Sequence, residues 1–160
     1  MRKYIPLLLA LCLLLCGCSA GAEEGEISIV ATDFPCYDLA QQVMGGGEGL
    51  TLLIRPGMDT HSYEPTPADA RAVYEADALI YIGGASDGWV EEMLAEAGNV
   101  TAVRLMDSVE ALEEEHDGHD HEDISYDEHI WTSPVNMRAM LESVTDTLCA
   151  ISPENADTYR

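Results

Sequence analysis

Apolar residues along this chain fall into two alternating patterns from residue 27 onward. Short, continuously apolar runs rich in β-branched side chains predict strands at 27–31, 50–54, 78–82 and 100–105. Longer stretches with apolar residues at helical spacing predict helices at 37–44, 67–76, 89–97 and 134–150. Strands that are apolar throughout are typical of a sheet covered on both faces, and strand–helix alternation favours parallel strands with right-handed crossovers. The pattern therefore predicts an α/β fold, a three-layer sandwich built on a four-stranded parallel sheet.

Three predicted helix starts use the same pair of residues, a hydroxyl followed by proline. They are Thr66-Pro67, Ser133-Pro134 and Ser152-Pro153. In each pair the hydroxyl is expected to cap the helix, and the proline suits its first turn. Asp69 stands three residues after Thr66, at the position that completes a capping box. The last pair predicts that a further helix starts after Ser152.

The residues before the first strand predict an export signal and a tether. Arg2 and Lys3 precede an apolar run over 5–16. This run is shorter than the roughly 20 apolar residues of a membrane-spanning helix, so residues 1–17 are expected to be a secretory signal peptide. The segment ending in Cys18 resembles a bacterial lipobox, which predicts cleavage before Cys18 and lipid on its thiol; simple secretion is the alternative. Residues 18–26 are small, acidic and aperiodic, as in a tether.

The charge balance excludes some classes of partner. The chain has 30 acidic and 7 basic residues, a formal charge of −23. Because the signal holds two of the basic residues and no acid, residues 18–160 carry −25. Such an excess repels nucleic acid and an acidic membrane surface, and it suits a soluble domain that works near cations.

Two cysteines, Cys36 and Cys149, lie outside the signal and the lipobox. An exported domain with two cysteines can join them in a disulfide, and two free, buried thiols are the alternative. Sequence alone leaves both open.

Two histidines fall where an open parallel sheet gathers its ligands. His61 follows the second predicted strand and His129 precedes the helix at 134–150, so both lie on loops expected at the carboxyl edge of the sheet. Imidazole binds zinc and other transition metals, and neighbouring carboxylates often orient the rings. The candidate orienting residues are Asp59, Glu64, Asp127 and Glu128. By their spacing alone, two distant histidines are a weak metal signal, and two unrelated loop residues are the favoured interpretation.

Longer runs around these histidines resemble a known family. "MDTHSYEPTPAD" and "DEHIWTSP" resemble the two ligand motifs of the zinc- and manganese-type metal-binding lipoproteins of ABC importers, and "ATDFPCYDLAQQV" and "ADALIYIGGASDGWVEEML" resemble their flanking segments. The resemblance implies that His61 and His129 are metal ligands and that residues 27–150 form the N-terminal lobe of a bilobed protein. It also implies that 151–160 begin the interlobe helix, and that the further ligands come from a second lobe beyond Arg160.

An acidic, histidine-rich segment over 113–123 favours zinc. It contains His116, His119 and His121 among seven acids, and such tracts bind transition metals weakly. In the resembled family such a segment accompanies zinc-type members, which implies an auxiliary capture loop. A solvated acidic loop with incidental histidines is the alternative.

The function expected from this resemblance is binding, without enzymatic activity. The chain would capture extracytoplasmic zinc, or alternatively manganese, and deliver it to an ABC importer permease, anchored by lipid to the outer face of a bacterial cytoplasmic membrane. The alternatives are a manganese or iron importer subunit, a surface metal buffer, and a serine hydrolase. The hydrolase rests on Ser86 in a G-x-S-x-G run; the competing interpretation is that Ser86 or Asp87 caps the helix that follows.

Cys18→Ser should abolish lipid attachment, because the thiol of Cys18 is the predicted acceptor. Metabolic labelling with a fatty-acid analogue is expected to mark the wild-type chain and leave the variant unlabelled. Cys36→Ser is the matched control and should label normally. Equal labelling of the Cys18→Ser and wild-type chains would show that the lipobox interpretation is wrong.

Overall fold

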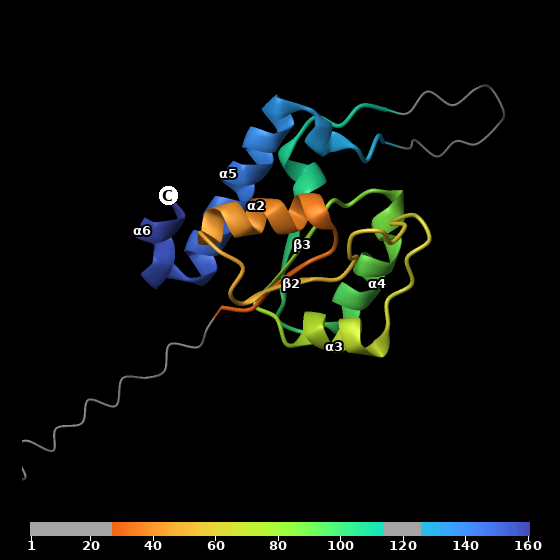
Figure 1. The fold of residues 1–160 in the computed structure, drawn as a ribbon, viewed down its shortest axis with the longest axis horizontal. Coiled ribbons are helices and arrows are strands. Elements are labelled where there is room, and N and C mark those ends of the chain that lie inside the picture. The colour runs from red at the N-terminus through yellow and green to blue at the C-terminus, as the bar shows by residue number, and fades with distance from the viewer. Residues whose placement is uncertain (1–26, 114–125) are drawn as a thin grey trace, which may run out of the picture.

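The computed structural model describes residues 27–113 and 126–160 (Figure 1). The sheet contains β1 (Ile29–Ala31), β2 (Leu50–Leu52), β3 (Ala78–Tyr81) and β4 (Thr101–Arg104). The longer helices are α2 (Phe34–Met44), α3 (Pro67–Tyr74), α4 (Gly88–Glu96) and α5 (Pro134–Ile151). All three strand pairings are parallel and the order is β2-β1-β3-β4. The predicted α/β class and four-stranded parallel sheet are confirmed, with strands shorter than expected.

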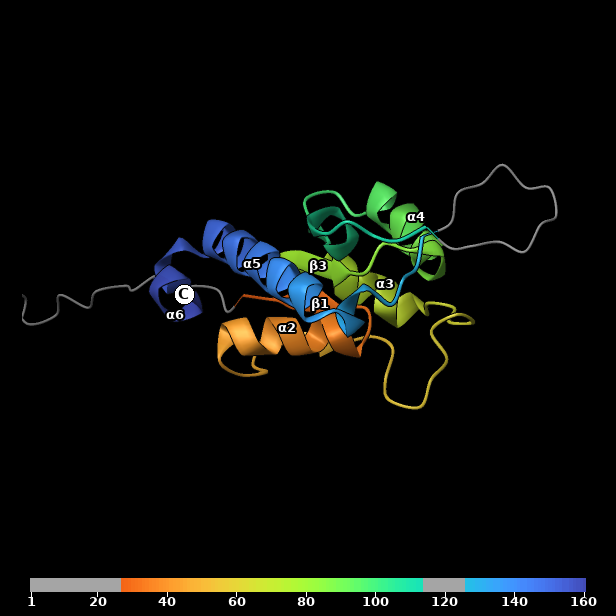
Figure 2. The same ribbon diagram turned by 90° about the horizontal axis from the view of Figure 1, so that it is seen from above.

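The three layers follow from the alternation of side chains along the strands. Ile29 and Ala31 of β1 face the helices α2 and α5, whereas Val30 faces α3 and α4. In β3, Ile80 faces α2 and α5, while Leu79 faces α3 and α4. Figure 2, seen from above, shows α2 and α5 on one side of the strands and α3 and α4 toward the other. A strand with an apolar core on both faces needs apolar residues at every position, which explains the continuous apolar runs.

The strand order creates a switch point between β1 and β3. The chain passes from β1 through α2 to β2 on one side, then crosses back through α3 to β3 on the other side of β1. At such a point neighbouring connections leave in opposite directions and open a crevice beyond the carboxyl ends of the strands. The candidate histidine loops lie at this edge.

Two of the three predicted caps are present. The Thr66 side chain and Asp69 form the complete capping box of α3, and the Ser133 hydroxyl accepts from Asn136 N at the start of α5. The third is wrong: the Ser152 hydroxyl makes no cap bond and is paired with the side chains of Glu154 and Asn155.

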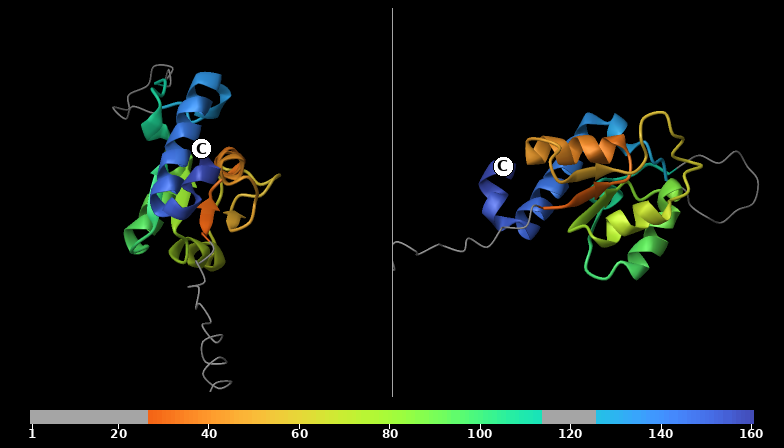
Figure 3. Two further views of the ribbon diagram at one scale, coloured as in Figure 1. Left: turned by 90° about the vertical axis from the view of Figure 1, so that its left-hand side faces the viewer. Right: turned by 60° about the horizontal axis from the view of Figure 1, so that its bottom comes forward.

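The chain after α5 turns back onto the lobe. A 3-10 turn, η5 (Pro153–Asn155), leads into a four-residue helix, α6 (Ala156–Tyr159), whose Tyr159 is buried in the core formed by α2 and α5. Figure 3 shows this turn beside α5 from two further sides. The assignment of 151–160 to an interlobe helix stays a prediction.

The two cysteines of the fold are both free and buried. Cys36 lies in α2 and accepts a hydrogen bond from the Thr32 hydroxyl, and burial raises the pKa of its thiol well above the ordinary value. The free-thiol alternative is therefore the correct one.

Met140→Ala should destabilise the fold strongly. Met140 lies on the inner face of α5 with none of its surface exposed, so truncation leaves a cavity and costs about 2–5 kcal/mol of unfolding free energy. Val135 lies on the same helix and is 78% exposed, so Val135→Ala is the matched control, expected within about 0.5 kcal/mol of wild type. Urea unfolding followed by circular dichroism measures both; equal losses would contradict the assigned core face of α5.

Candidate metal centre

A small cavity lies where the connections after all four strands meet. Its volume is about 30 Å³, enough for roughly one or two waters or a single ion. The lining residues are Asp33 after β1; Ile54, Thr60 and His61 after β2; Ile82, Ser86 and Asp87 after β3; and Glu128, His129 and Trp131 after β4. The structure thus brings together two histidines that are far apart in the sequence, at the predicted edge of the sheet.

The loop that carries His61 is ordered by a local turn. Asp59 accepts from the His61 backbone amide at 3.1 Å and from the Ser62 hydroxyl at 3.0 Å, as the side chain of a turn-forming aspartate does. The imidazole itself is held from elsewhere, because His61 Nδ1 lies 2.7 Å from the Ser86 hydroxyl. This contact occupies Nδ1 and leaves Nε2 as the nitrogen that can bind a metal.

His129 is oriented by the residue two positions before it. Asp127 Oδ1 accepts from the His129 backbone amide at 2.9 Å and lies 2.8 Å from ring Nδ1. These hydrogen bonds from His129 lower the pKa of Asp127. The His129 ring also packs at a tilt against Trp131, with ring centroids 5.3 Å apart. As with His61, Nδ1 is engaged and Nε2 is the nitrogen left for a metal.

Two buried carboxylates lie in the same cavity. Asp33 caps α2 by accepting from Cys36 N, and Asp87 accepts from Gly83 N at 2.9 Å. Each is only 8% exposed. Burial raises the pKa of Asp33, and burial together with the charges of Asp33 and Glu128 raises that of Asp87 to about 6. A bound cation would relieve this repulsion, so the cavity favours positive charge.

The turn between β3 and α4 joins the two histidine loops. Glu128 accepts from Ser86 N at 2.6 Å and lies so close to Gly84 that a Cβ there would come within 2.2 Å of its side chain. A side chain at position 84 would therefore displace Glu128 from this turn. Through these contacts Glu128 links the loop before α5 to the turn after β3.

Neither Ser86 nor Asp87 makes a side-chain cap bond at the start of α4, so the expected cap is wrong. Ser86 bonds the His61 ring and Asp87 bonds Gly83, because the turn curls into a 3-10 segment, η2 (Ala85–Asp87). A hydrolase nucleophile sits on a strained turn. Among the described residues no non-glycine has positive φ, so Ser86 lacks that backbone strain.

The other predicted site residues have different places. Asp127 lies against the His129 ring, whereas Asp59 accepts only from the His61 amide and the Ser62 hydroxyl. Glu64 is exposed and does not line the cavity. The auxiliary histidines and the lipidation cysteine lie outside the described residues; they are His116, His119, His121 and Cys18. In the part of the chain that the structure describes, no three histidine, cysteine or acidic side chains are grouped closely enough to hold a metal by themselves.

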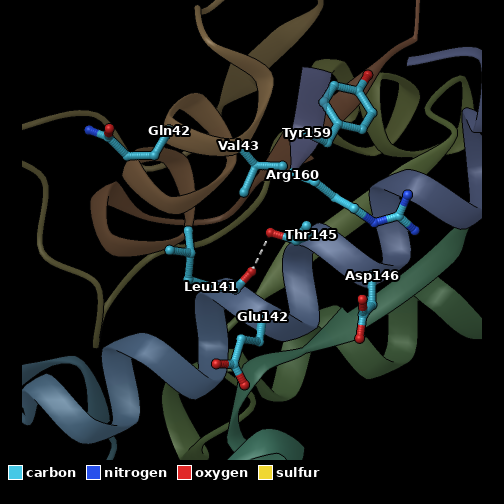
Figure 4. A pocket seen from close by; sticks show the side chains of 8 residues that line it. All are labelled: Gln42, Val43, Leu141, Glu142, Thr145, Asp146, Tyr159 and Arg160. Atoms are coloured by element: carbon cyan, nitrogen blue, oxygen red, sulfur yellow. Dashed lines mark hydrogen bonds between the residues drawn. The ribbon is translucent and has the colours of Figure 1, made fainter. Parts of the chain in front are cut away.

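A larger pocket, of about 740 Å³, lies between α2, α5 and the C-terminal residues (Figure 4). It is lined by Gln42, Val43, Leu141, Glu142, Thr145, Asp146, Tyr159 and Arg160. No histidine or cysteine lines it, so it offers no nitrogen or sulfur ligand, and it shares no residue with the histidine cavity.

Comparison with known protein families matches residues 29–160 to the zinc-uptake complex component A, periplasmic (ZnuA). The zinc-binding lipoprotein AdcA of Streptococcus pneumoniae is 32% identical over 99% of this chain and 34% of its own length. The crystal structure of the Zn(II)-bound ZnuA-like domain of that AdcA has a TM-score of 0.71 at 28% identity, covering 84% of this chain and 48% of that one. A Mn-bound periplasmic metal-binding protein from Candidatus Liberibacter asiaticus shares the fold, with a TM-score of 0.71 at 22% identity over 84% of this chain and 49% of that one.

These matches define the class as metal-binding solute-binding proteins. The chain belongs to the family of the periplasmic zinc-uptake component ZnuA. It spans between about 28% and 49% of the length of the relatives it matches. Because the family is one of solute-binding proteins, the prediction that the chain is not an enzyme is confirmed. Within residues 27–113 and 126–160, no helix has the length and apolar character needed to cross a membrane.

Asp87→Asn should remove a pH dependence of stability. The fold raises the pKa of Asp87 from 3.8 to about 6, so the native state holds the proton more tightly than the unfolded chain. The contribution of Asp87 to the free energy of unfolding therefore falls as pH rises from about 4 to about 6. Between pH 4.5 and 7 this loss is on the order of 2 kcal/mol.

Urea unfolding of the metal-free chain at both pH values tests this. The wild type is expected to lose stability relative to Asp87→Asn as the pH rises. Asp59→Asn, at an exposed acid of the same face, is the control and should keep the wild-type profile. Parallel profiles for wild type and Asp87→Asn would contradict the assigned burial of this carboxylate.

Proposed function

We propose that this protein captures zinc outside the cytoplasm and passes it to the permease of an ABC importer. The observation that carries the proposal is the shared cavity, in which two imidazoles have Nδ1 engaged by an oxygen and Nε2 left for a metal. Membership of a zinc-uptake family supports the same role.

His61 and His129 are the proposed protein ligands of the zinc. Both must be neutral to bind, so protonation competes with the metal and affinity falls in acid. Zinc in a closed site usually has four ligands. The two described histidines provide two of them, and water or groups beyond the described residues provide the others. Asp127 and Ser86 orient the rings, while Asp33 and Asp87 supply negative charge nearby.

Zinc is preferred over manganese on ligand chemistry. Imidazole nitrogen suits zinc, oxygen donors suit manganese, and affinity for nitrogen sites rises from manganese to zinc. The relatives of higher identity are named for zinc, and the histidine-rich tract over 113–123 adds exchangeable nitrogen ligands. Manganese is the alternative, because a manganese-bound protein shares the fold.

The proposed location is the outer face of a bacterial cytoplasmic membrane, with the chain anchored through lipid on Cys18. A surface metal buffer that feeds no permease is the competing function. The two are separated by growth under zinc chelation: loss of this protein and loss of the permease should give the same defect if the protein is an importer component. If loss of the permease causes a growth defect and loss of this protein causes none, then this chain neither captures nor delivers the zinc that the cell needs.

His61→Ala and His129→Ala should each remove the tighter zinc site. Either change leaves one imidazole in the cavity, which is too few protein ligands to hold zinc firmly. Competition titration of the purified chain against a chromophoric zinc chelator measures the affinity. The matched control changes His116, His119 and His121 together to alanine, which should remove only weaker, additional sites. Loss of the tight site in this control, with retention in the single variants, would contradict the assignment.

A further inference from the structure

We propose that Ser86 is the positioning residue of His61, whose hydroxyl accepts from Nδ1–H and so presents Nε2 to the metal. This inference rests on the proposed function, since it concerns how one ligand of the same site is held. It gives Ser86, which the sequence offers as a hydrolase nucleophile, a role in metal binding.

The Ser86 hydroxyl is fixed by the turn that carries it. The Ser86 amide donates to Glu128 at 2.6 Å, and Asp87 N donates back to Gly84 O at 3.1 Å. On the other side, Gly83 donates to Asp87, and its carbonyl accepts from Arg104 Nη2 at 2.6 Å. Because the turn is held by these hydrogen bonds, the Ser86 hydroxyl stays in one place and can fix the orientation of the His61 ring.

No acid near His61 in the sequence replaces this contact. Asp59, the nearest, has one oxygen bonded to the His61 amide and the other to Ser62. The ring is therefore oriented by a residue 25 positions away, on a different loop. Since Ser86 also bonds Glu128, beside His129, its turn lies between the two ligand loops.

The two histidines consequently have unlike partners. A carboxylate can only accept, so Asp127 requires a proton on His129 Nδ1 and leaves Nε2 unprotonated for the metal. A hydroxyl can donate or accept, so Ser86 permits either tautomer of His61 until a metal takes the Nε2 lone pair. Ser86 then accepts from Nδ1–H and holds the ring without adding charge.

Ser86→Ala should weaken zinc binding by about 10-fold or more, within the range of about 10- to 100-fold found for partners of metal-bound histidines. Ser86→Thr keeps a hydroxyl and should recover most of the affinity. Ser108→Ala is the matched control, because the Ser108 hydroxyl donates to Leu105 O and Ser108 does not line the histidine cavity. The zinc affinity of each purified variant is measured by competition against a zinc chelator.

A second readout separates positioning from a general structural effect. Ring nitrogen and Nδ1–H chemical shifts in the zinc-loaded protein should show that the hydrogen bond from His61 Nδ1–H is lost in Ser86→Ala and restored in Ser86→Thr, while His129 is unchanged. Wild-type affinity in Ser86→Ala, no rescue by threonine, or weakened binding with unaltered His61 shifts would each overturn the proposal. If His61→Ala itself leaves zinc affinity unchanged, the proposed function fails; if it abolishes binding while Ser86→Ala does not weaken it, only this inference fails.

Discussion

Because the four strands are parallel and buried on both faces, their carboxyl ends lie together at one edge, and every connection that leaves this edge passes the same small cavity. The crossover from β2 to β3 places the switch point between β1 and β3, where a crevice must form. The site depends on this constraint. His61 and His129 need no contact with each other, because the sheet fixes the positions of the loops that carry them.

The fold and the meeting of the two histidine loops at one edge of the sheet were predictable because their signals are local. Continuous apolar runs mark buried strands, and the motif runs around His61 and His129 mark the loops that follow them. The contact between Ser86 and His61 and the burial of Asp33 were not predictable, because both depend on which loops meet across the sheet. Asp33 left one local signal, an aspartate ahead of proline at a helix start. The Ser152 cap failed because a tight turn, with nearby side chains competing for the hydroxyl, replaced the expected helix.

Charge is distributed unevenly around the cavity. Asp33 and Asp87 are buried together, which costs stability when both are ionised and favours a cation close by. Of the two ring partners, Asp127 is a carboxylate and Ser86 is neutral. One histidine thus has a charged partner and the other an uncharged one.

Trp131 packs against His129, which places a natural fluorophore beside the histidine cavity. With ring centroids 5.3 Å apart, the indole is close enough for its emission to be sensitive to a metal on that imidazole. The chain has only one other tryptophan, Trp89, which packs with the cluster on the opposite face of the sheet. We therefore expect the fluorescence of Trp131 to follow metal binding at His129 without any attached dye, while Trp89, which packs against Tyr63 of the His61 loop, contributes the remaining emission.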